Sequence, residues 1–152
     1  MAYQSRGRTF EEFKAGETFE SQARTVEAGD VSLFAGLTGD FNPLHTDEET
    51  ARQTPLKGRI AHGLLTLGIS GGQQNQLGLF EGTTLALLGL DKLRFTAPVR
   101  FGDTIHTELT VKETRESSKP DRGIVIFETA VKNQRGETVL QFEQSVMMMR
   151  RK

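Results

Sequence analysis

Two short stretches of this sequence hold the residue types that acid–base chemistry needs. Residues 39–45 read Gly-Asp-Phe-Asn-Pro-Leu-His, so that a carboxylate, Asp40, precedes an imidazole, His45, by five positions. Further on, the pair His62-Gly63 opens a glycine-rich apolar segment. A carboxylate and an imidazole can take up and return a proton, and a backbone N–H at a helix start can stabilise a negatively charged oxygen. These residues suggest an enzyme that polarises a carbonyl group and transfers a proton.

Spacing alone leaves the Asp40–His45 pair open to two interpretations. Residues five apart lie up to ~17 Å from each other in an extended chain, but a turn at Asn42-Pro43 can bring both side chains to one pocket. Alternatively, Asp40 caps a turn, His45 lies on the surface and His62 makes a local backbone hydrogen bond. A metal site at these three side chains is not expected, because their spacing matches no standard zinc pattern and no fourth ligand is apparent.

Two short helices are expected to flank this pair. Asp30 is the predicted N-cap of a helix that Gly39 ends, because apolar residues recur between them at helical spacing. Thr46 and Glu49 are predicted to form a capping box for a second helix at about 47–53, since each side chain can satisfy a backbone N–H of the other residue. Helices on both sides would hold the acid–base pair in place at little further entropic cost.

A longer helix is predicted from His62 to about Leu77. Its interior holds Gly68, Gly71 and Gly72, each of which costs ~1 kcal/mol relative to alanine. Gly68 shares one face of the helix with the other two glycines. The simplest explanation of that cost is the close approach of another backbone, which is expected for a central helix surrounded by a sheet.

The C-terminal half has the alternation that is typical of antiparallel strands. Apolar and polar residues alternate from Ile105 to Val111, and further strands are predicted at 84–95, 123–131 and 138–149. The first of these strands is expected to begin with buried leucines, namely Leu85, Leu87 and Leu88. The order of strand, short helices, long helix and strands indicates the α+β class, with one helix packed on a curved antiparallel sheet.

Composition argues against several other kinds of protein. The 152 residues fit one domain spanning 1–152, and a net charge of −1 with a pI near 6.3 argues against nucleic-acid binding. The chain has no cysteine, which excludes disulfides and thiolate chemistry. No apolar run reaches the ~18–20 residues of a membrane span, and Met1 to Phe13 lacks a signal-peptide core. We therefore expect a cytoplasmic protein that binds neither membrane nor nucleic acid.

Both motifs resemble the signature of a known enzyme family. The sequence at 39–45 and the sequence Ile-Ala-His-Gly-Leu-Leu at 60–65 are similar to the hydratase motif of the MaoC-like, (R)-specific enoyl-CoA hydratases. The similarity continues through 93–95 and 101–103, and covers most of about 30–110. It implies a hot-dog fold, in which a bent antiparallel sheet wraps a long central helix. It also implies a homodimer or larger homo-oligomer, with the acyl chain and pantetheine in a tunnel near the subunit interface.

The resemblance also assigns roles to the site residues. Asp40 and His45 would hold one water, whose oxygen adds to C3 of a trans-2-enoyl thioester while a proton reaches C2. The Gly63 N–H would hold the thioester oxygen. Asn42 would orient the loop and contribute to substrate binding, and His62 is a further candidate substrate-binding residue.

One position departs from the family pattern. The family often has a serine on the central helix that helps to position the site. Gly71 stands where that serine is expected, and Ser70 lies one position away. Ser70 is therefore a candidate substrate-binding residue whose role stays open.

The implied activity is that of a carbon–oxygen lyase, which hydrates trans-2-enoyl-CoA reversibly to (R)-3-hydroxyacyl-CoA. Coenzyme A is then part of the substrate and no other cofactor is expected, while an acyl-carrier-protein thioester and any acyl chain length stay open. One alternative is a hot-dog thioesterase, but residues 64–78 of the long helix contain no carboxylate for hydrolysis. The other alternative is a subunit that binds acyl-CoA without chemistry.

Overall fold

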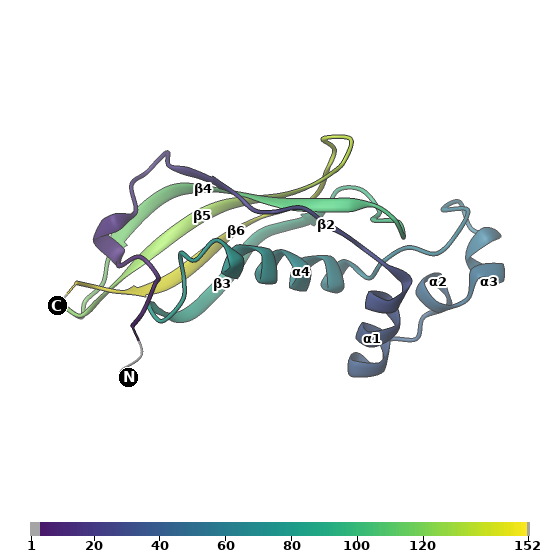
Figure 1. Ribbon diagram of the computed structural model, residues 1–152, viewed down its shortest axis with the longest axis horizontal. Coiled ribbons are helices and arrows are strands. Elements are labelled where there is room, and N and C mark those ends of the chain that lie inside the picture. Colours follow the sequence, from purple (N-terminus) through teal and green to yellow (C-terminus); the bar gives the residue numbers. More distant parts are fainter. Residues whose placement is uncertain (1–3, 152) are drawn as a thin grey trace.

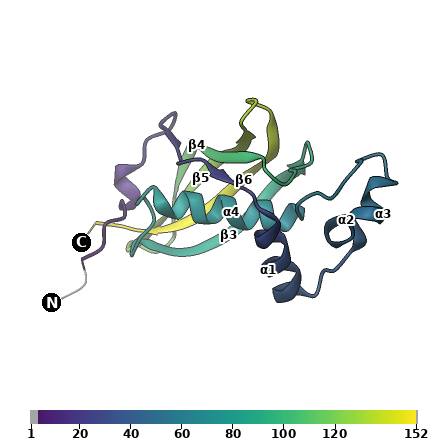
Figure 2. The same cartoon turned by 45° about the vertical axis from the view of Figure 1, so that its right-hand side comes forward.

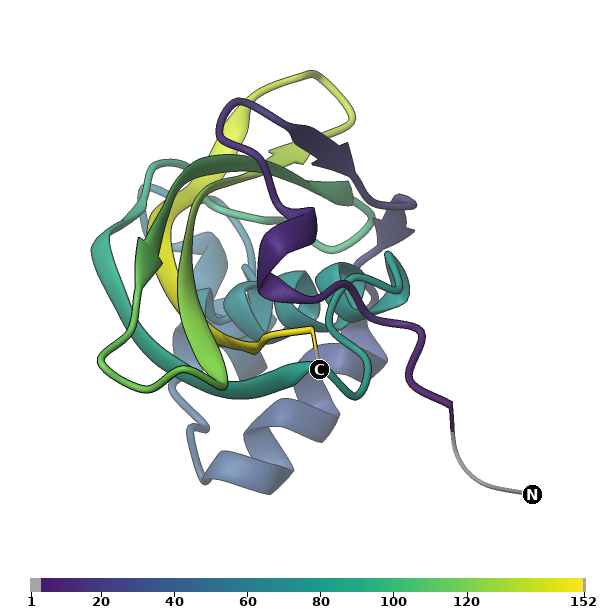
Figure 3. The same cartoon turned by 90° about the vertical axis from the view of Figure 1, so that its left-hand side faces the viewer.

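A curved antiparallel sheet wraps one long helix, α4 (Gly63–Gln76), as Figure 1 and the end-on view of Figure 3 show. The computed structural model describes residues 4–151. Residues 1–3, which belong to the stretch used for the signal-peptide prediction, and Lys152 lie outside the described residues, as do the predicted domain limits 1 and 152. The helix lying on the concave face of the sheet is the arrangement that the α+β prediction required.

In residues 4–151, six strands form the sheet in the order β1-β4-β5-β6-β3, and β2 pairs with β4 beside β1. All pairings are antiparallel. The strands are β1 (Thr18–Glu20), β2 (Arg24–Thr25), β3 (Thr84–Phe95), β4 (Thr104–Glu116), β5 (Arg122–Asn133) and β6 (Thr138–Met149). The predicted strands 84–95 and 138–149 are confirmed with their limits, and the predicted strand 123–131 is slightly longer at both ends.

The remaining helices are short, and most of them gather at one end of the sheet. They are η1 (Phe10–Glu12), α1 (Ala28–Thr38), α2 (Pro43–Thr46) and α3 (Glu48–Arg52). Figure 1 and Figure 2 show α1, α2 and α3 beyond the N-terminal end of α4, away from both chain termini. Among the described residues, no helix has both the length and the apolar character that crossing a membrane requires.

The main core lies between α4 and the concave face of the sheet. In β4, Ile105, Leu109 and Val111 are fully buried, as their alternation predicts, because every second side chain of a strand points to the same face. From α4, Leu65 and Ile69 pack into the same core cluster as Ile105. This packing fixes the helix, and therefore its N-terminus, against the sheet.

The capping residues of the short helices differ from the prediction. Asp30 lies in the first turn of α1 rather than before it, and its Oδ2 accepts the backbone N–H of Glu27, the actual N-cap, at 2.9 Å. Thr46 ends α2, and α3 is capped by Asp47, whose Oδ1 accepts the Thr50 N–H at 3.1 Å. In both cases another residue has the extended conformation of an N-cap: Asp47 directly follows Thr46, and Glu27 precedes Asp30 by three positions.

The glycines of α4 do not mark a close backbone approach. A Cβ atom added at Gly68, Gly71 or Gly72 would have no atom within 4 Å apart from the neighbouring helix backbone. All three lie on the open side of the helix, so the prediction that the sheet clasps them is wrong. Because these glycines have no side chain, they leave open space beside the helix.

The start of β3 is also more open than predicted. Leu85, Leu87 and Leu88 are 39%, 59% and 47% exposed, whereas we expected them to be buried. The reason is topological, since β3 is an edge strand that pairs only with β6. Alternation in a sequence does not reveal whether a strand is central or at an edge.

Candidate active site

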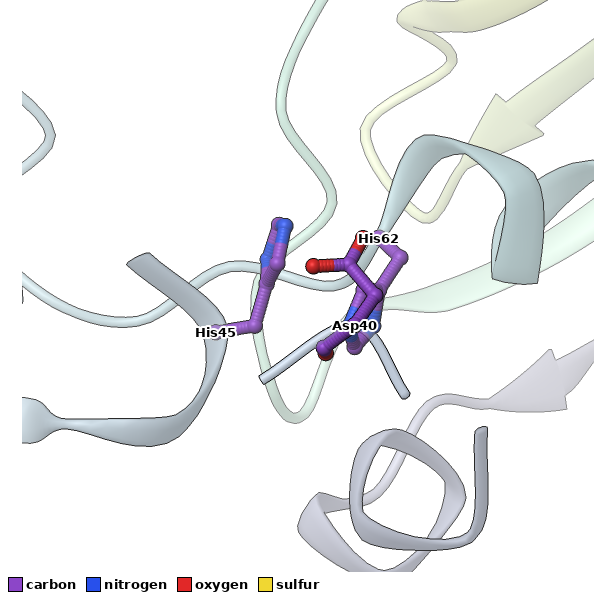
Figure 4. A group of neighbouring side chains, drawn as sticks. All are labelled: Asp40, His45 and His62. Carbon is purple, nitrogen blue, oxygen red and sulfur yellow. The ribbon is translucent and has the colours of Figure 1, made fainter. Parts of the chain in front are cut away.

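The connector between α1 and α2 brings Asp40 and His45 together. Gly39 ends α1 in a left-handed conformation (φ 79°), which turns the chain at Asp40. Asn42 then caps α2, its Oδ1 accepting the Leu44 N–H at 3.0 Å. Figure 4 shows the Asp40 carboxylate pointing toward the His45 ring, and one polar atom from each of Asp40, His45 and His62 lies within 4.8 Å of the others.

The hydrogen bonding of His45 determines which ring nitrogen faces the site. His45 Nδ1 lies 2.8 Å from the backbone oxygen of Ile60. A carbonyl oxygen can only accept, so Nδ1 carries the hydrogen. In the neutral ring the lone pair is therefore on Nε2, and this nitrogen can accept a proton. The half-buried ring is held by a segment that is distant in sequence, and it is not a free surface side chain.

His62 fixes the position of Asp40. Its side chain is only 2% exposed, and its Nε2 donates to the backbone oxygen of Asp40 at 3.0 Å. The ring also packs on His45, with centroids 3.9 Å apart, and on Phe34 at 4.8 Å. His62 makes a backbone hydrogen bond, as the structural interpretation held, but to a residue 22 positions away. It therefore locks the connector onto the start of α4.

Gly63 is the first residue of α4 and lies in the wall of a cavity of about 480 Å³, which we call the site cavity. Among the described residues, no acceptor bonds the Gly63 N–H, as expected for the first turn of a helix. A Cβ atom at this position would lie 2.9 Å from the Phe95 ring, so glycine leaves the room that a close approach needs. The cavity is lined by His45, Ile60, Ala61, Gly63, Leu64, Thr66, Phe95, Thr96, Ala97, Pro98, Val99 and Val139.

A second cavity, of about 380 Å³, lies further along α4 against β3 and β6. Gly71 forms part of its wall, and the open space at this glycine belongs to the cavity. Most of its lining is apolar: Leu67, Gly71, Gln74, Asn75, Phe80, Thr84, Leu87, Leu90, Phe142, Gln144 and Val146. An apolar chamber thus follows the site cavity in the direction of the helix.

Ser70 lines neither cavity. Its hydroxyl is fully buried, where it accepts from Gln74 Nε2 at 3.2 Å and donates to Thr107 Oγ1, 2.9 Å away, whose own hydrogen goes to Gln73. Gln144 also donates to Gln74 at 2.6 Å. One position along a helix turns a side chain by ~100°, which separates buried Ser70 from Gly71 at the cavity. Polar residues in an apolar helical segment were the sequence signal for this network, which our sequence reasoning missed.

The carboxylates of Asp40 and Glu48 differ in their charged partners. Among the described residues, Asp40 forms no ion pair, and its carboxylate accepts only the Asn42 N–H at 3.3 Å. On α3, by contrast, the Arg59 guanidinium, assisted by Arg52, lowers the pKa of Glu48 below its ordinary value. The Asp40 carboxylate is thus free to bind a polar ligand, which is not so for Glu48.

Within the described residues, two groups of side chains have the composition of metal ligands. Asp40, His45 and His62 converge despite their unusual spacing, but each histidine already donates one ring nitrogen to a carbonyl oxygen. The second group lies on the outer face of the sheet, where His106 Nε2 is 3.3 Å from Glu108 Oε1. His106 thus has a carboxylate partner. The absence of a metal stays a prediction at both places.

The curved sheet around a central helix, with a carboxylate and an imidazole brought together near the N-terminus of that helix, defines a hot-dog protein. The chain belongs to the MaoC-like domain family, whose sequence pattern matches residues 11–133. It is 36% identical to the (R)-specific enoyl-CoA hydratase of Rhodospirillum rubrum, over 91% of this chain and 90% of that protein. Family membership agrees with the resemblance seen in the two motifs.

Two solved structures illustrate the fold. A monoamine oxidase regulatory protein from Archaeoglobus is 38% identical and superposes with a TM-score of 0.90, over 96% of this chain and 97% of the other. A Mycobacterium tuberculosis protein described as a double hotdog fold superposes with a TM-score of 0.85 at 23% identity. This chain covers 98% of its own length but only 46% of that protein, so it corresponds to one of two such units.

Proposed function

We propose that this protein is a carbon–oxygen lyase that adds water reversibly to trans-2-enoyl thioesters to give (R)-3-hydroxyacyl thioesters. The observation that carries the proposal is that His45 and Gly63 line one cavity, while the Asp40 carboxylate converges with the His45 ring. Its similarity to a named (R)-specific enoyl-CoA hydratase over nine-tenths of both chains supports the same chemistry. The carboxylate-free helix α4 gives the thioesterase alternative no support.

The acceptor atoms of Asp40 and His45 indicate how a proton is transferred in this reaction. Ionised Asp40 and the Nε2 of neutral His45 are both acceptors, so one water can donate a hydrogen to each. One of the two groups takes a proton from this water as its oxygen bonds to C3. The double-bond electrons move toward C2 and the thioester oxygen, and the same proton is then returned to C2. The net reaction adds OH to C3 and H to C2, and Asp40 and His45 return to their initial protonation states.

The thioester oxygen gains negative charge during this addition. The Gly63 N–H at the positive end of α4 is the donor we assign to it, because it has no acceptor among the described residues. Asn42 contributes by capping α2, and His62 by holding the Asp40 backbone. For Ser70 we propose a structural role, since its hydroxyl bonds Thr107 and Gln74.

A second copy of the chain is proposed to complete the site. Phe41, Leu64 and Phe95 are large apolar side chains that are exposed beside the pair, and Leu33 and Leu37 extend this surface along α1. Exposed apolar surface of this kind marks an interaction site. The double hotdog protein, which contains two such units in one chain, supports a homodimer here. Coenzyme A as part of the substrate, no other cofactor, a single domain and a cytoplasmic location all stay predictions.

Purified protein is expected to hydrate crotonyl-CoA, followed as loss of the absorbance of the conjugated thioester, and to form the (R)-3-hydroxy product. The reason is the carboxylate–imidazole pair with its unpaired backbone donor. Chiral analysis of the product checks the face of addition. Release of free CoA without hydration would favour the thioesterase alternative, and tight binding without turnover across acyl lengths would favour a non-catalytic subunit.

The second cavity is the proposed place of the acyl chain, which leads to a prediction about chain length. Gly71→Phe would fill this cavity, because Gly71 has open space and lies in its wall. We expect kcat/KM for trans-2-octenoyl-CoA to fall about tenfold or more, while the value for crotonyl-CoA changes little. Gly72→Phe is the matched control, since Gly72 is equally open but is not part of this wall. Equal losses with both acyl chains would contradict the assignment.

A further inference from the structure

Arg100 lies next to the residues that line the site cavity. The segment that contains Ile60 and Ala61 runs antiparallel to the segment that ends in Val99 and Arg100, with an isolated bridge between Ile60 and Arg100. The Ala61 N–H donates to the Val99 oxygen at 2.8 Å. Ile60, Ala61 and Val99 all line the site cavity. Arg100 therefore lies directly beside this lining, next to the turn that carries Lys57.

The Arg100 guanidinium is held over that turn. Its Nη2 donates to the backbone oxygen of Leu56 at 2.7 Å, and its Nη1 would be 4.0 Å from a Cβ atom at Gly58. Lys57 lies between these two contacts in the chain and is exposed. A hydrogen bond to a carbonyl oxygen thus holds the Arg100 guanidinium beside the backbone of Lys57.

The charges of Lys57 and Arg100 are not neutralised locally. A carboxylate oxygen of Glu48 would lie 3.4 Å from a Cβ atom at Gly58, but Glu48 already bonds Arg52 and Arg59, at 3.0 Å each. The Asp103 carboxylate accepts the Arg100 backbone N–H at 2.9 Å and is paired with Arg135. Neither Lys57 nor Arg100 forms an ion pair with any carboxylate in the described part of the chain. Both positive charges are therefore available to a ligand that is itself an anion.

The backbone of Lys57 points to the same conclusion. Its φ of 57° is left-handed, a conformation that lysine rarely adopts. Lys92 has a similar φ of 53°, but it lies in an irregular part of β3 and its Nζ pairs with Glu143 at 2.6 Å. Lys57 has no such partner among the described residues. The Lys57 N–H donates to the Thr54 oxygen at 3.0 Å, so the residue closes a turn in this conformation. Sparsely populated backbone conformations of this kind cluster at functional sites.

We propose that Lys57 and Arg100 bind a phosphate group of the pantetheine carrier, while the thioester at the other end of the pantetheine reaches Gly63. This inference rests on the proposed function. Guanidinium and ammonium groups are the usual protein partners of phosphate. Coenzyme A and acyl carrier protein both carry a phosphate on pantetheine, and only coenzyme A adds the 3′-phosphate. The two cations thus act on carrier recognition and do not take part in the addition of water.

A series of crotonyl thioesters tests this assignment. The carriers are coenzyme A, 3′-dephospho-coenzyme A, 4′-phosphopantetheine and pantetheine, which lose their phosphates stepwise. With the unaltered protein, KM is expected to rise about tenfold at the step that removes the bound phosphate, with little change in kcat. A rise at the first step identifies the 3′-phosphate of coenzyme A. A rise only at the last step identifies the phosphate that both carriers share.

Variants then connect the effect to the two residues. Lys57→Gln and Arg100→Gln are each expected to raise KM for crotonyl-CoA about tenfold and to leave crotonyl-pantetheine turnover unchanged. Arg100→Lys should recover part of the loss, because it restores the charge. Lys119→Gln is the matched control. Lys119 is also without an ion pair in the described chain, but it lies in the β4–β5 turn at the opposite end of the molecule from α3 (Figure 1).

The outcomes separate this inference from the proposed function. Hydration of all four thioesters with the same KM would overturn the phosphate site and leave the hydratase proposal intact. Equal effects of Arg100→Gln on crotonyl-CoA and crotonyl-pantetheine would also overturn it, since they would indicate a damaged cavity wall. Failure to hydrate any thioester would instead contradict the proposed function.

Discussion

Asp40→Asn and His45→Asn are each expected to lower the rate of crotonyl-CoA hydration by ~10²-fold or more, which is the usual loss when a general acid or base is removed. Asparagine at position 40 keeps the shape of the side chain but is a far weaker base. Asparagine at position 45 keeps a donor for the Ile60 oxygen and removes the second ring nitrogen. Steady-state rates at saturating substrate measure the effect directly.

The controls for this prediction use the stability of the fold. The Asp40 carboxylate makes only a 3.3 Å contact with the Asn42 N–H, so its replacement should leave the thermal midpoint nearly unchanged. Because the two groups share one water, the double variant should be little slower than the slower single variant. Near wild-type rates in both folded single variants would contradict the acid–base assignment. Multiplied losses in the double variant would contradict the shared water.

The fold was predictable wherever one local pattern dominates. Strands β3 and β6 were predicted with the limits observed, because an apolar run and a hairpin turn are signals that act over a few residues. Exposure of Leu85 and Leu87 was not predictable, since it depends on which strand is at the edge of the sheet. The caps were also missed, because Thr46 and Asp47 both suit an N-cap and the backbone conformation decides between them.

For the site, the sequence predicted which residues meet but not how they are held. The Asn42-Pro43 turn correctly indicated that Asp40 and His45 converge. The hydrogen on His45 Nδ1 depends on the Ile60 oxygen, 15 residues away, and no local pattern reports such a contact. The polar atoms under α4 are a similar case, because Ser70 meets Thr107 only in the folded chain.

The glycines of α4 show why a correct residue can be explained wrongly. A glycine within a helix has a cost, and we attributed that cost to the close approach of another backbone. In the structure the same absence of a side chain leaves space at Gly71 beside the second cavity. Only Gly63 has a close neighbour, the Phe95 ring, and it lies at the end of the helix. Glycine at the start of the helix thus allows a close contact, whereas glycine within the helix leaves space for a cavity.

Gly63→Pro is expected to lower the hydration rate by ~10²-fold or more beyond the effect of Gly63→Ala. Both variants add a Cβ atom that would lie 2.9 Å from the ring of Phe95, an exposed side chain that can shift. Only proline also removes the N–H, and losing one oxyanion donor costs ~10²–10³-fold in comparable sites. The ratio of the two rates therefore measures the backbone donor separately from the added bulk.

The helix should accept this proline because of where Gly63 lies. Gly63 is the first residue of α4, the one helical position where proline is favoured. His62 before it has φ −61° and ψ 139°, which a residue preceding proline readily adopts. Circular dichroism and the thermal midpoint of both variants check that the fold is kept. If folded Gly63→Pro is as fast as Gly63→Ala, the thioester oxygen is stabilised by another group, and the Gly63 assignment fails while the Asp40–His45 pair stands.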